Sequence, residues 1–309
     1  MSTSSVSIGF VGAGNMGRPM IDHLQRAGHR LTVFARRPEV IDALRAQGVA
    51  VVTTPAQAAA AAEFVFVNVT NTADVEAVLF GSEGIVEGAR PGTVVIDHST
   101  ISPVATRAFA QRLAERGIEH LDAPVSGGVA GAQAATLAIM VGGKAEVLER
   151  ARPLLAVLGK SIVHVGDHGA GQVTKLCNQI VQVVNIEGIA EAMLLARAQG
   201  VALDRVLSAL QAGFAGSKML DLMGPKMVAR DFAAGIEARL HDKDFGLAAE
   251  EAEALHLTLP AVSAVREQLR SLVAAGMGYD DTSSLLRVLE QAAAPTQAQR
   301  GGMADQRPE

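Results

Sequence analysis

The stretch of sequence that decides the fold reads SIGFVGAGNMG and runs from Ser7 to Gly17. Its first part, Ser7 to Val11, is a short apolar and β-branched run, which predicts a buried strand. A helical stretch, Arg18 to Arg26, follows the motif at once. Between strand and helix stand the residues of a candidate dinucleotide-binding loop: Gly12, Ala13, Gly14, Asn15, Met16 and Gly17. A glycine pattern in this context is what binding of a pyrophosphate requires.

The three glycines of this loop have separate expected roles. Gly12 permits the tight turn, Gly14 lets the backbone approach a pyrophosphate, and Gly17 allows the helix to pack closely. The N-terminus of the helix then faces the anion. The alternative interpretation is an ordinary glycine turn between a strand and a helix.

The end of the second predicted strand, Arg30 to Phe34, bears on the choice of cofactor. Sites selective for NAD commonly place Asp or Glu there, where the carboxylate binds the ribose hydroxyls. Here the chain continues with Ala35, Arg36 and Arg37. Two guanidinium groups could hold a 2′-phosphate, which favours NADP over NAD. The alternative is a solvated pair of surface arginines.

Outward from this region, β-branched runs alternate with helical stretches through the first half of the chain. After the second strand, the predicted strands are residues 64–69, 93–97, 119–121, 137–141 and 161–165. This alternation predicts an α/β domain over residues 1–168, a Rossmann-like, doubly wound and mainly parallel sheet covered by helices. The run Phe64 to Val67 is apolar throughout, as expected for a strand buried on both faces.

The pattern changes at Gly169. Residues 171–200 contain no proline and a single internal glycine, Gly188, which predicts a long interdomain helix. Five further helical stretches are expected at residues 203–212, 218–229, 244–255, 261–275 and 282–293. We therefore expect an all-α domain over residues 169–293 that serves substrate binding and oligomerisation. Residues 294–309 have few apolar anchors and are expected to form a disordered tail.

Composition narrows the function classes. The chain has 309 residues and a formal net charge of -5, so its composition gives no sign of the basic surface that nucleic-acid binding requires. Its single cysteine, Cys177, cannot form an internal disulfide, and no metal-ligand spacing surrounds it, which favours a cytoplasmic protein without a metal. The apolar run from Val6 to Val11 is too short for a membrane span. The long helix is apolar on nearly every side, which favours a homodimer or homotetramer.

Two loops carry polar groups suited to ligand binding. Thr100 follows the strand at residues 93–97, at the edge where ligands of open α/β sheets bind, so it could reach the nicotinamide or ribose. A helix N-cap is the alternative role for this segment. In the second loop, Ser126, Gly127 and Gly128 offer consecutive backbone N–H groups, an anion nest suited to a substrate carboxylate. A plain glycine turn is the alternative there.

The start of the long helix carries a polar stripe. Lys175, Asn178, Gln179 and Gln182 share one helical face by their spacing. Buried polar groups need partners or a ligand. A partly desolvated lysine near the positive end of a helix has its pKa moved towards the range useful for proton exchange. The alternative is a surface lysine with amides at a helix contact.

Together with a fourth motif, Leu240 to Asp244, these segments resemble the 3-hydroxyacid dehydrogenase family over about residues 6 to 290. The family includes 3-hydroxyisobutyrate dehydrogenases, tartronate semialdehyde reductases and glyoxylate or succinic semialdehyde reductases. The resemblance implies an NAD(P)-dependent oxidoreductase. Its reaction would interconvert a small hydroxy acid and the corresponding semialdehyde or oxo acid.

The resemblance also implies a role for each site residue. The implied assignments are the dinucleotide-binding Gly12, Gly14 and Gly17, the cofactor contact Thr100, the substrate-carboxylate site Ser126, Gly127 and Gly128, the catalytic Lys175, and Asn178, which positions the substrate. In the fourth motif, Lys243 would lie near the nicotinamide, and His241 and Asp244 would be structural.

Two departures from the family pattern bear on the substrate. Gln179 stands where many members have a second asparagine. This Asn178–Gln179 pair, together with Ala215-Gly216-Ser217 and Leu220-Asp221, resembles tartronate semialdehyde reductases more than hydroxyisobutyrate enzymes. Ala135 precedes Thr136 where many relatives have glycine, so the shape of the substrate loop differs. Imine reduction is a further alternative, but it occurs when the lysine is replaced. A non-catalytic NADP-binding module would not need Lys175 and Asn178.

Overall fold

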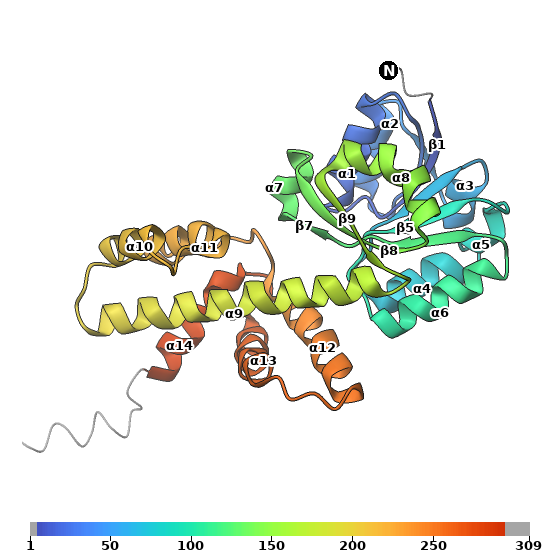
Figure 1. The fold of residues 1–309 in the computed structure, drawn as a ribbon. Coiled ribbons are helices and arrows are strands. Elements are labelled where there is room, and N and C mark those ends of the chain that lie inside the picture. The colour runs from blue at the N-terminus through green and yellow to red at the C-terminus, as the bar shows by residue number, and fades with distance from the viewer. Residues whose placement is uncertain (1–4, 294–309) are drawn as a thin grey trace, which may run out of the picture. The chain divides into compact units, whose positions relative to one another are not determined.

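A computed structural model describes residues 5–293 of the chain (Figure 1). Contacts divide the chain into two compact units, and the division falls between Asn178 and Gln179. This point lies inside the long helix, whereas the sequence analysis places the boundary before Gly169, where the helical stretch opens.

The first unit is built on one mixed sheet. Its strands are β1 (Ser7–Val11), β2 (Arg30–Phe34), β3 (Ala50–Val52), β4 (Phe64–Val67), β5 (Val94–Asp97), β6 (Glu119–Asp122), β7 (Val125–Ser126), β8 (Leu137–Gly143) and β9 (Gly159–Gly166). They follow the order β3-β2-β1-β4-β5-β6-β8-β7, with β9 paired to β8. Strands β1 to β6 are parallel, and β8 runs antiparallel to β6 and β7. The order reverses between β1 and β4, which is the switch point of a doubly wound sheet.

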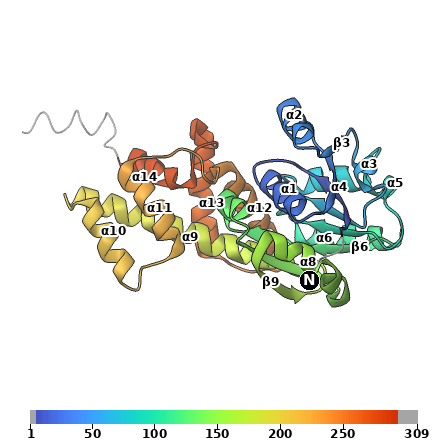
Figure 2. The ribbon, with the colours of Figure 1, turned by 90° about the horizontal axis from the view of Figure 1, so that it is seen from above.

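Helices cover both faces of this sheet (Figures 1 and 2). They are α1 (Gly17–Arg26), α2 (Pro38–Ala46), α3 (Pro55–Ala59), α4 (Thr72–Phe80), α5 (Ile85–Gly88), α6 (Pro103–Ala114), α7 (Gly128–Gln133) and α8 (Ala145–Leu158). Phe64 and Phe66 pack in one apolar cluster with α1, α2 and α8, and Val65 and Val67 pack in another with α3 to α6. Alternate residues of β4 thus enter opposite cores, which is why every position is apolar. The predicted α/β class is confirmed.

The second unit contains the rest of α9 (Ala170–Ala198), whose start belongs to the first unit. Its other elements are α10 (Leu203–Ala212), α11 (Lys218–Ala229), α12 (Ala238–Ala254), α13 (Pro260–Leu272), the single turns η1 (Val273–Met277) and η2 (Thr282–Ser284), and α14 (Leu285–Ala293). Within residues 179–293, the only strand-like pairing is an isolated bridge between Glu237 and Asp281. The predicted helical second domain is confirmed. The predicted tail, residues 294–309, lies outside the described residues.

Several predicted bounds were wrong. Strands β3 and β7 were missed because segments of three and two residues are too short to show an alternating pattern. Helix α12 begins at Ala238 and not at Asp244. Its first turns bury His241 and Asp244, so polar residues occupy positions where a search for apolar periodicity expects hydrophobic ones.

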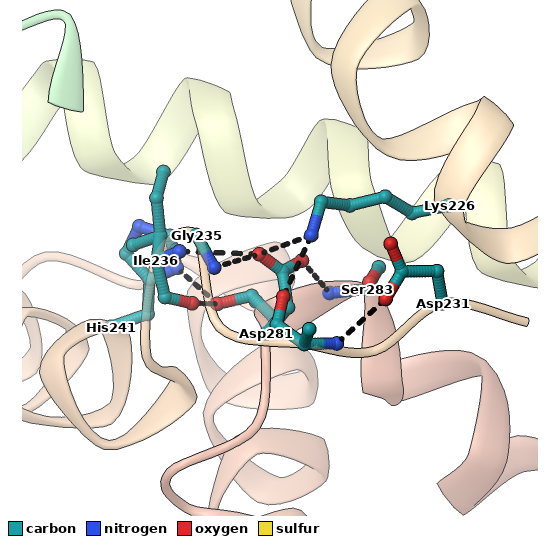
Figure 3. Close-up of polar contacts among 9 residues, drawn as sticks. Lys226, Asp231, Gly235, Ile236, His241, Asp281 and Ser283 are labelled. Atoms are coloured by element: carbon teal, nitrogen blue, oxygen red, sulfur yellow. Dashed lines mark hydrogen bonds and ion pairs between the residues drawn. The ribbon is translucent and has the colours of Figure 1, made fainter. Parts of the chain in front are cut away.

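A buried carboxylate, that of Asp281, holds the segment that precedes α12 (Figure 3). Its Oδ2 accepts hydrogen bonds from the N–H groups of Gly235 (2.9 Å) and Ile236 (3.1 Å), and its Oδ1 accepts one from Ser283 (3.0 Å). The Nζ of Lys226 lies 3.4 Å from Oδ2. Burial alone would raise the pKa of Asp281, but these hydrogen bonds lower it below its usual value. The ionised carboxylate therefore fixes the approach to the helix that carries the fourth motif.

Helix α9 is the one described helix that is long and apolar enough, by length and composition, to cross a membrane. An 18-residue window has a mean hydropathy of 1.3, and 39% of that window is buried. Its first turns, however, carry Gln172, Lys175 and Asn178, and polar residues of this kind are rare in lipid-facing helices.

Glu187, in the second part of α9, is a buried carboxyl group. Its side chain is 7% exposed, and its Oε2 has no hydrogen-bond partner within the described chain. Burial, and then the charge of Glu191, raises the pKa of Glu187 to about 7. The folded chain therefore holds a proton on Glu187 at pH values where an unfolded glutamate is ionised.

We expect this group to make the free energy of unfolding fall as pH rises from 4.5, the ordinary value for Glu187, to about 7. In that window the unfolded chain loses the proton first. Glu187→Gln should remove the effect and stabilise the protein above pH 7 by roughly 2 kcal/mol, with little change near pH 4.5. Urea unfolding across this pH range measures the difference. Glu191→Gln removes only the smaller cause, the neighbouring charge, so it should weaken the pH dependence without removing it. An unchanged pH slope in Glu187→Gln would contradict the assignment.

Candidate active site

The glycine loop joins β1 to α1 and packs against the loop after β4. Gly12 has a φ of +107°, and a Cβ there would lie 2.0 Å from the carbonyl oxygen of Asn68. A Cβ at Gly17 would lie 2.0 Å from the carbonyl oxygen of Gly12. A Cβ at Gly14 would meet nothing within 4 Å. Packing therefore requires glycine at two positions, while the third faces open space.

The open side of Gly14 fits a dinucleotide. The N–H of Arg18 bonds to the carbonyl oxygen of Gly14 (2.9 Å), so this loop leads directly into α1. Met16, the N-cap residue, supplies no side-chain acceptor, and the first turn of α1 has no acidic residue. Backbone N–H groups at such a helix start can bind an anion. The residues present therefore fit the pyrophosphate of a nicotinamide dinucleotide.

The two arginines after β2 differ in their surroundings. Arg37 is the N-cap residue of α2, and its Nε lies 3.6 Å from an Oε1 of Glu39, with both side chains more than half exposed. Arg36 is also exposed. Arg37 thus forms a surface ion pair with Glu39, so Arg36 is the arginine that we expect to contact a 2′-phosphate.

Hydrogen bonds connect the loops at the carboxyl ends of the parallel strands. The Oγ of Ser99 accepts a bond from the N–H of Val69 (2.9 Å), which joins the loops after β4 and β5. The Nδ1 of His98 donates to the carbonyl oxygen of Ala123 (2.5 Å), which joins β5 to β6. Burial lowers the pKa of His98 to about 4, so its ring is neutral at pH 7. The loop that holds Thr100 is therefore fixed to both neighbours.

Asp122, the last residue of β6, caps the first turn of α9. Its Oδ1 accepts from the N–H of Gly169 (2.9 Å), and its Oδ2 accepts from the N–H of Gln172 (3.0 Å). The side chain is fully buried, and a Cβ at Gly171 would lie 2.8 Å from Oδ2. This carboxylate satisfies backbone donors at a helix start that would otherwise be orphaned. It anchors the helix that carries Lys175.

Gln172 connects α9 to the loop after β5. Its Nε2 donates to the carbonyl oxygen of Ser99 (2.8 Å), and its Oε1 accepts from the N–H of Ile101 (3.1 Å). These two bonds hold the residues on either side of Thr100. Ser102 is the N-cap residue of α6, so Thr100 does not cap this helix.

The predicted nest and the polar stripe meet within the first unit. Gly127 and Gly128, which lead from β7 into α7, have φ values of +138° and +61°, a region that favours glycine. The Oγ of Ser126 donates to the Oδ1 of Asn178 at 3.4 Å. Two residues that the sequence separates widely, and that the resemblance assigns to substrate binding, are therefore in contact.

Lys175 lies one helical turn beyond Gln172. Its side chain is 8% exposed, so the alternative of a solvated surface lysine is wrong. Asn178 follows three residues later and shares the same helical face. Lysine side chains are rarely this buried in folded proteins. A lysine that is buried usually has a specific partner or a function, because an unpaired buried charge is unfavourable.

The second unit places the fourth motif on α12. The Nε2 of Gln179 donates to the Oδ2 of Asp244 (2.6 Å), and the Nζ of Lys243 lies 2.8 Å from its Oδ1. The Nδ1 of His241 bonds to the Oγ1 of Thr282 (2.8 Å). Asp244 thus links the lysine of the motif to α9, and His241 secures the start of α12.

Sequence reasoning missed the roles of Asp122, Gln172 and His98. A carboxylate at a strand end and a glutamine in the first turn of a helix were the available signals. Their partners, however, are remote in the chain: Asp122 and Gly169 are 47 positions apart, and Gln172 and Ser99 are 73 apart. As for metals, the described residues contain no group of three or more His, Cys, Asp or Glu side chains that could hold an ion.

Known proteins share this architecture along almost the whole chain. Residues 7–166 match the NAD binding domain of 6-phosphogluconate dehydrogenase, and residues 169–289 match the NAD-binding domain of NADP-dependent 3-hydroxyisobutyrate dehydrogenase. A 2-hydroxy-3-oxopropionate reductase of Escherichia coli (strain K12) is 43% identical over 285 residues, which cover 92% of this chain and 97% of the relative. The chain belongs to the 3-hydroxyacid dehydrogenase family.

Solved structures agree with this assignment. A Mycobacterium tuberculosis 3-hydroxyisobutyrate dehydrogenase, solved with L-serine, is 34% identical, has a TM-score of 0.85, and matches over 92% of this chain and 99% of its own. An imine reductase from Streptomyces aurantiacus is 24% identical with a TM-score of 0.63, covering 91% of this chain and 99% of its own, and shares the fold alone. This 3-hydroxyacid dehydrogenase is an NAD(P)-dependent oxidoreductase, which confirms the reaction class predicted from the sequence.

Proposed function

We propose that this enzyme reduces tartronate semialdehyde, which is 2-hydroxy-3-oxopropionate, with Lys175 as the proton donor. The observation that carries the proposal is the buried Lys175 on the same helical face as Asn178, which itself bonds to Ser126. The substrate is supported by the 43% identity to a 2-hydroxy-3-oxopropionate reductase. The Asn178–Gln179 pair, which resembles tartronate semialdehyde reductases more than hydroxyisobutyrate enzymes, supports the same substrate.

The chemistry assigned to the chain's own residues is binding and proton transfer. Ser126, Gly127 and Gly128 bind the substrate carboxylate through a hydroxyl group and backbone N–H groups. The bound nicotinamide supplies the hydride. Negative charge develops on the carbonyl oxygen, and Lys175 neutralises it by donating a proton from Nζ, while Asn178 holds the substrate in line. In the oxidation direction, Lys175 accepts the proton.

Initial rates would test this function. The purified protein is assayed with NADPH and NADH against tartronate semialdehyde, glyoxylate, succinic semialdehyde and methylmalonate semialdehyde. We expect the highest kcat/KM with tartronate semialdehyde. A preference for methylmalonate semialdehyde would instead favour a 3-hydroxyisobutyrate dehydrogenase, the activity named for the neighbour solved with L-serine. Cofactor binding without turnover of any aldehyde acid would overturn the proposal.

We also propose that NADP is the preferred cofactor and that Arg36 binds its 2′-phosphate. Arg36→Ala should raise the KM for NADPH by roughly tenfold, the loss expected for a charge-assisted hydrogen bond, and change the KM for NADH little. Arg37→Ala is the matched control, because that side chain pairs with Glu39 at 3.6 Å. Equal KM changes for both cofactors in Arg36→Ala would contradict the assignment.

The assembly we propose is a homodimer or homotetramer in the cytoplasm. Large apolar side chains of the second unit are exposed: Val181 (71%) and Leu195 (66%) on α9, and the fully exposed Phe214. Contact with a second copy would remove these side chains from water.

Size-exclusion chromatography with light scattering measures the mass of the assembly, and a strict monomer would contradict the proposed homodimer or homotetramer. The proposed cytoplasmic location is supported by the single cysteine, Cys177, which cannot form an internal disulfide of the kind common in secreted proteins.

A further inference from the structure

We propose that Asp122 and Gln172 form a clamp that positions Lys175 and Thr100 for hydride transfer. The inference rests on the proposed function of Lys175 and adds two positioning residues to it. The clamp is defined as these two side chains, both fully buried in the first unit. We assign neither Asp122 nor Gln172 a direct contact with the substrate or the cofactor, so both act as positioning residues.

Every polar atom of the clamp is used. Asp122 bonds to two N–H groups at the start of α9, at 2.9 and 3.0 Å. Gln172 bonds to a carbonyl oxygen and an N–H group of the loop after β5, at 2.8 and 3.1 Å. Because one Gln172 atom must donate and the other must accept, its amide has a single orientation. The clamp therefore joins the end of β6, the loop after β5 and the first turn of α9 in one arrangement.

This arrangement determines where the two functional groups lie. Ser99 and Ile101 are both held by Gln172, so Thr100 between them has little freedom. Lys175 follows Gln172 by one turn of a regular helix, so its position depends on the anchored first turn. A displacement of about 1 Å of a reacting group can cost roughly 10²-fold in rate. Loss of the clamp should therefore affect turnover more than folding.

The carboxylate of the clamp also sets the charge at the start of α9. Burial raises the pKa of Asp122, whereas the hydrogen bonds from Gly169 and Gln172 and the charge of His168, in the loop before the helix, oppose that rise. His168 stacks on His120 at a centroid distance of 5.9 Å. Burial lowers the pKa of His120 to about 3, so this ring is neutral. A negative charge at a helix start offsets the positive end of the helix dipole and stabilises an ammonium group in the next turns.

Two substitutions at Gln172 test the geometric part. Gln172→Met keeps the length of the side chain but removes both bonds to the loop, and we expect kcat to fall at least tenfold with a change in substrate KM of less than about threefold. In Gln172→Glu, a protonated carboxyl group can again donate to Ser99, so part of the lost kcat should return as pH falls. A side chain with only a structural role would not produce this pH-dependent rescue.

Asp122→Asn tests the electrostatic part through the pH profile, because the substitution also breaks one of the two backbone hydrogen bonds: an amide nitrogen cannot accept from an N–H group. Removing the charge destabilises the ammonium form of Lys175, so the alkaline limb of kcat/KM for aldehyde reduction should move to lower pH by about one unit. The matched control for loss of stability is Leu148→Ala, which opens a cavity at a residue 1% exposed on α8. This control should lower Tm and retain the wild-type kcat and pH profile.

The outcomes separate this inference from the function it rests on. If Lys175→Ala keeps normal turnover, the proposed function fails. If Lys175→Ala is inactive, while Gln172→Met and Asp122→Asn keep the wild-type kcat and pH profile, the clamp is overturned and the function of Lys175 stands. If Leu148→Ala, at a similar loss of Tm, loses as much kcat as the clamp variants, the lost activity follows from stability alone, the clamp is structural and the inference is wrong.

Discussion

Lys175→Ala is expected to lower kcat for aldehyde reduction by a factor of roughly 10² or more, because it removes a positioned general acid. NADPH affinity should change little, since the glycine loop that binds the pyrophosphate is untouched. Stopped-flow or initial-rate measurements of NADPH oxidation give kcat, and fluorescence titration gives the cofactor Kd. Burial of Lys175, at 8% exposure, makes the loss specific, because water cannot readily replace the ammonium group.

A small amine and a surface lysine provide the controls. Methylammonium added to Lys175→Ala should restore part of the rate, since it can supply the missing proton donor within the cavity left by the side chain. Lys160→Ala, at an exposed position on β9, should behave as wild type. Normal turnover by Lys175→Ala, without added amine, would show that another group donates the proton.

Gly14→Val is expected to raise the Kd for NADPH by at least roughly 10²-fold while the free energy of unfolding stays close to that of the wild type. A Cβ at Gly14 meets no protein atom within 4 Å, so the folded chain can accept a side chain there. The same side chain would fill the space in which the backbone approaches the pyrophosphate. Calorimetric titration with NADPH and urea unfolding measure the two quantities.

Substitutions at two other glycines serve as controls for Gly14→Val. Gly12→Ala should destabilise the fold itself, because its Cβ would lie 2.0 Å from the carbonyl oxygen of Asn68 at a φ of +107°. Gly188→Ala, within α9 and with nothing within 4 Å of its Cβ, should bind NADPH normally. Unchanged NADPH affinity in Gly14→Val would mean that the cofactor does not use this loop.

The fold class could be predicted from the sequence because it depends on local patterns. A strand buried on both faces must be apolar at every position, and the run from Phe64 to Val67 showed this directly. The glycine loop could also be predicted, since its tight turn and the packing of Gly17 against Gly12 depend on residues within six positions of one another. The stretches without alternation, such as the three residues of β3, left no comparable signal.

The sequence by itself determined the alternation of strands and helices in the first unit, the helical class of the second, the presence of a dinucleotide loop, and which polar residues were candidates for chemistry. Only the tertiary structure decided which candidates are buried and what they contact. The residue pattern by itself left a solvated surface open for Lys175, although the family resemblance assigned it to catalysis, and the structure shows that it is buried. The role of Asp122 was not predicted, because its partner Gly169 is remote in the chain. The physical reason is that helix and strand formation follows from neighbouring residues, whereas desolvation and hydrogen bonding depend on segments that meet only after folding.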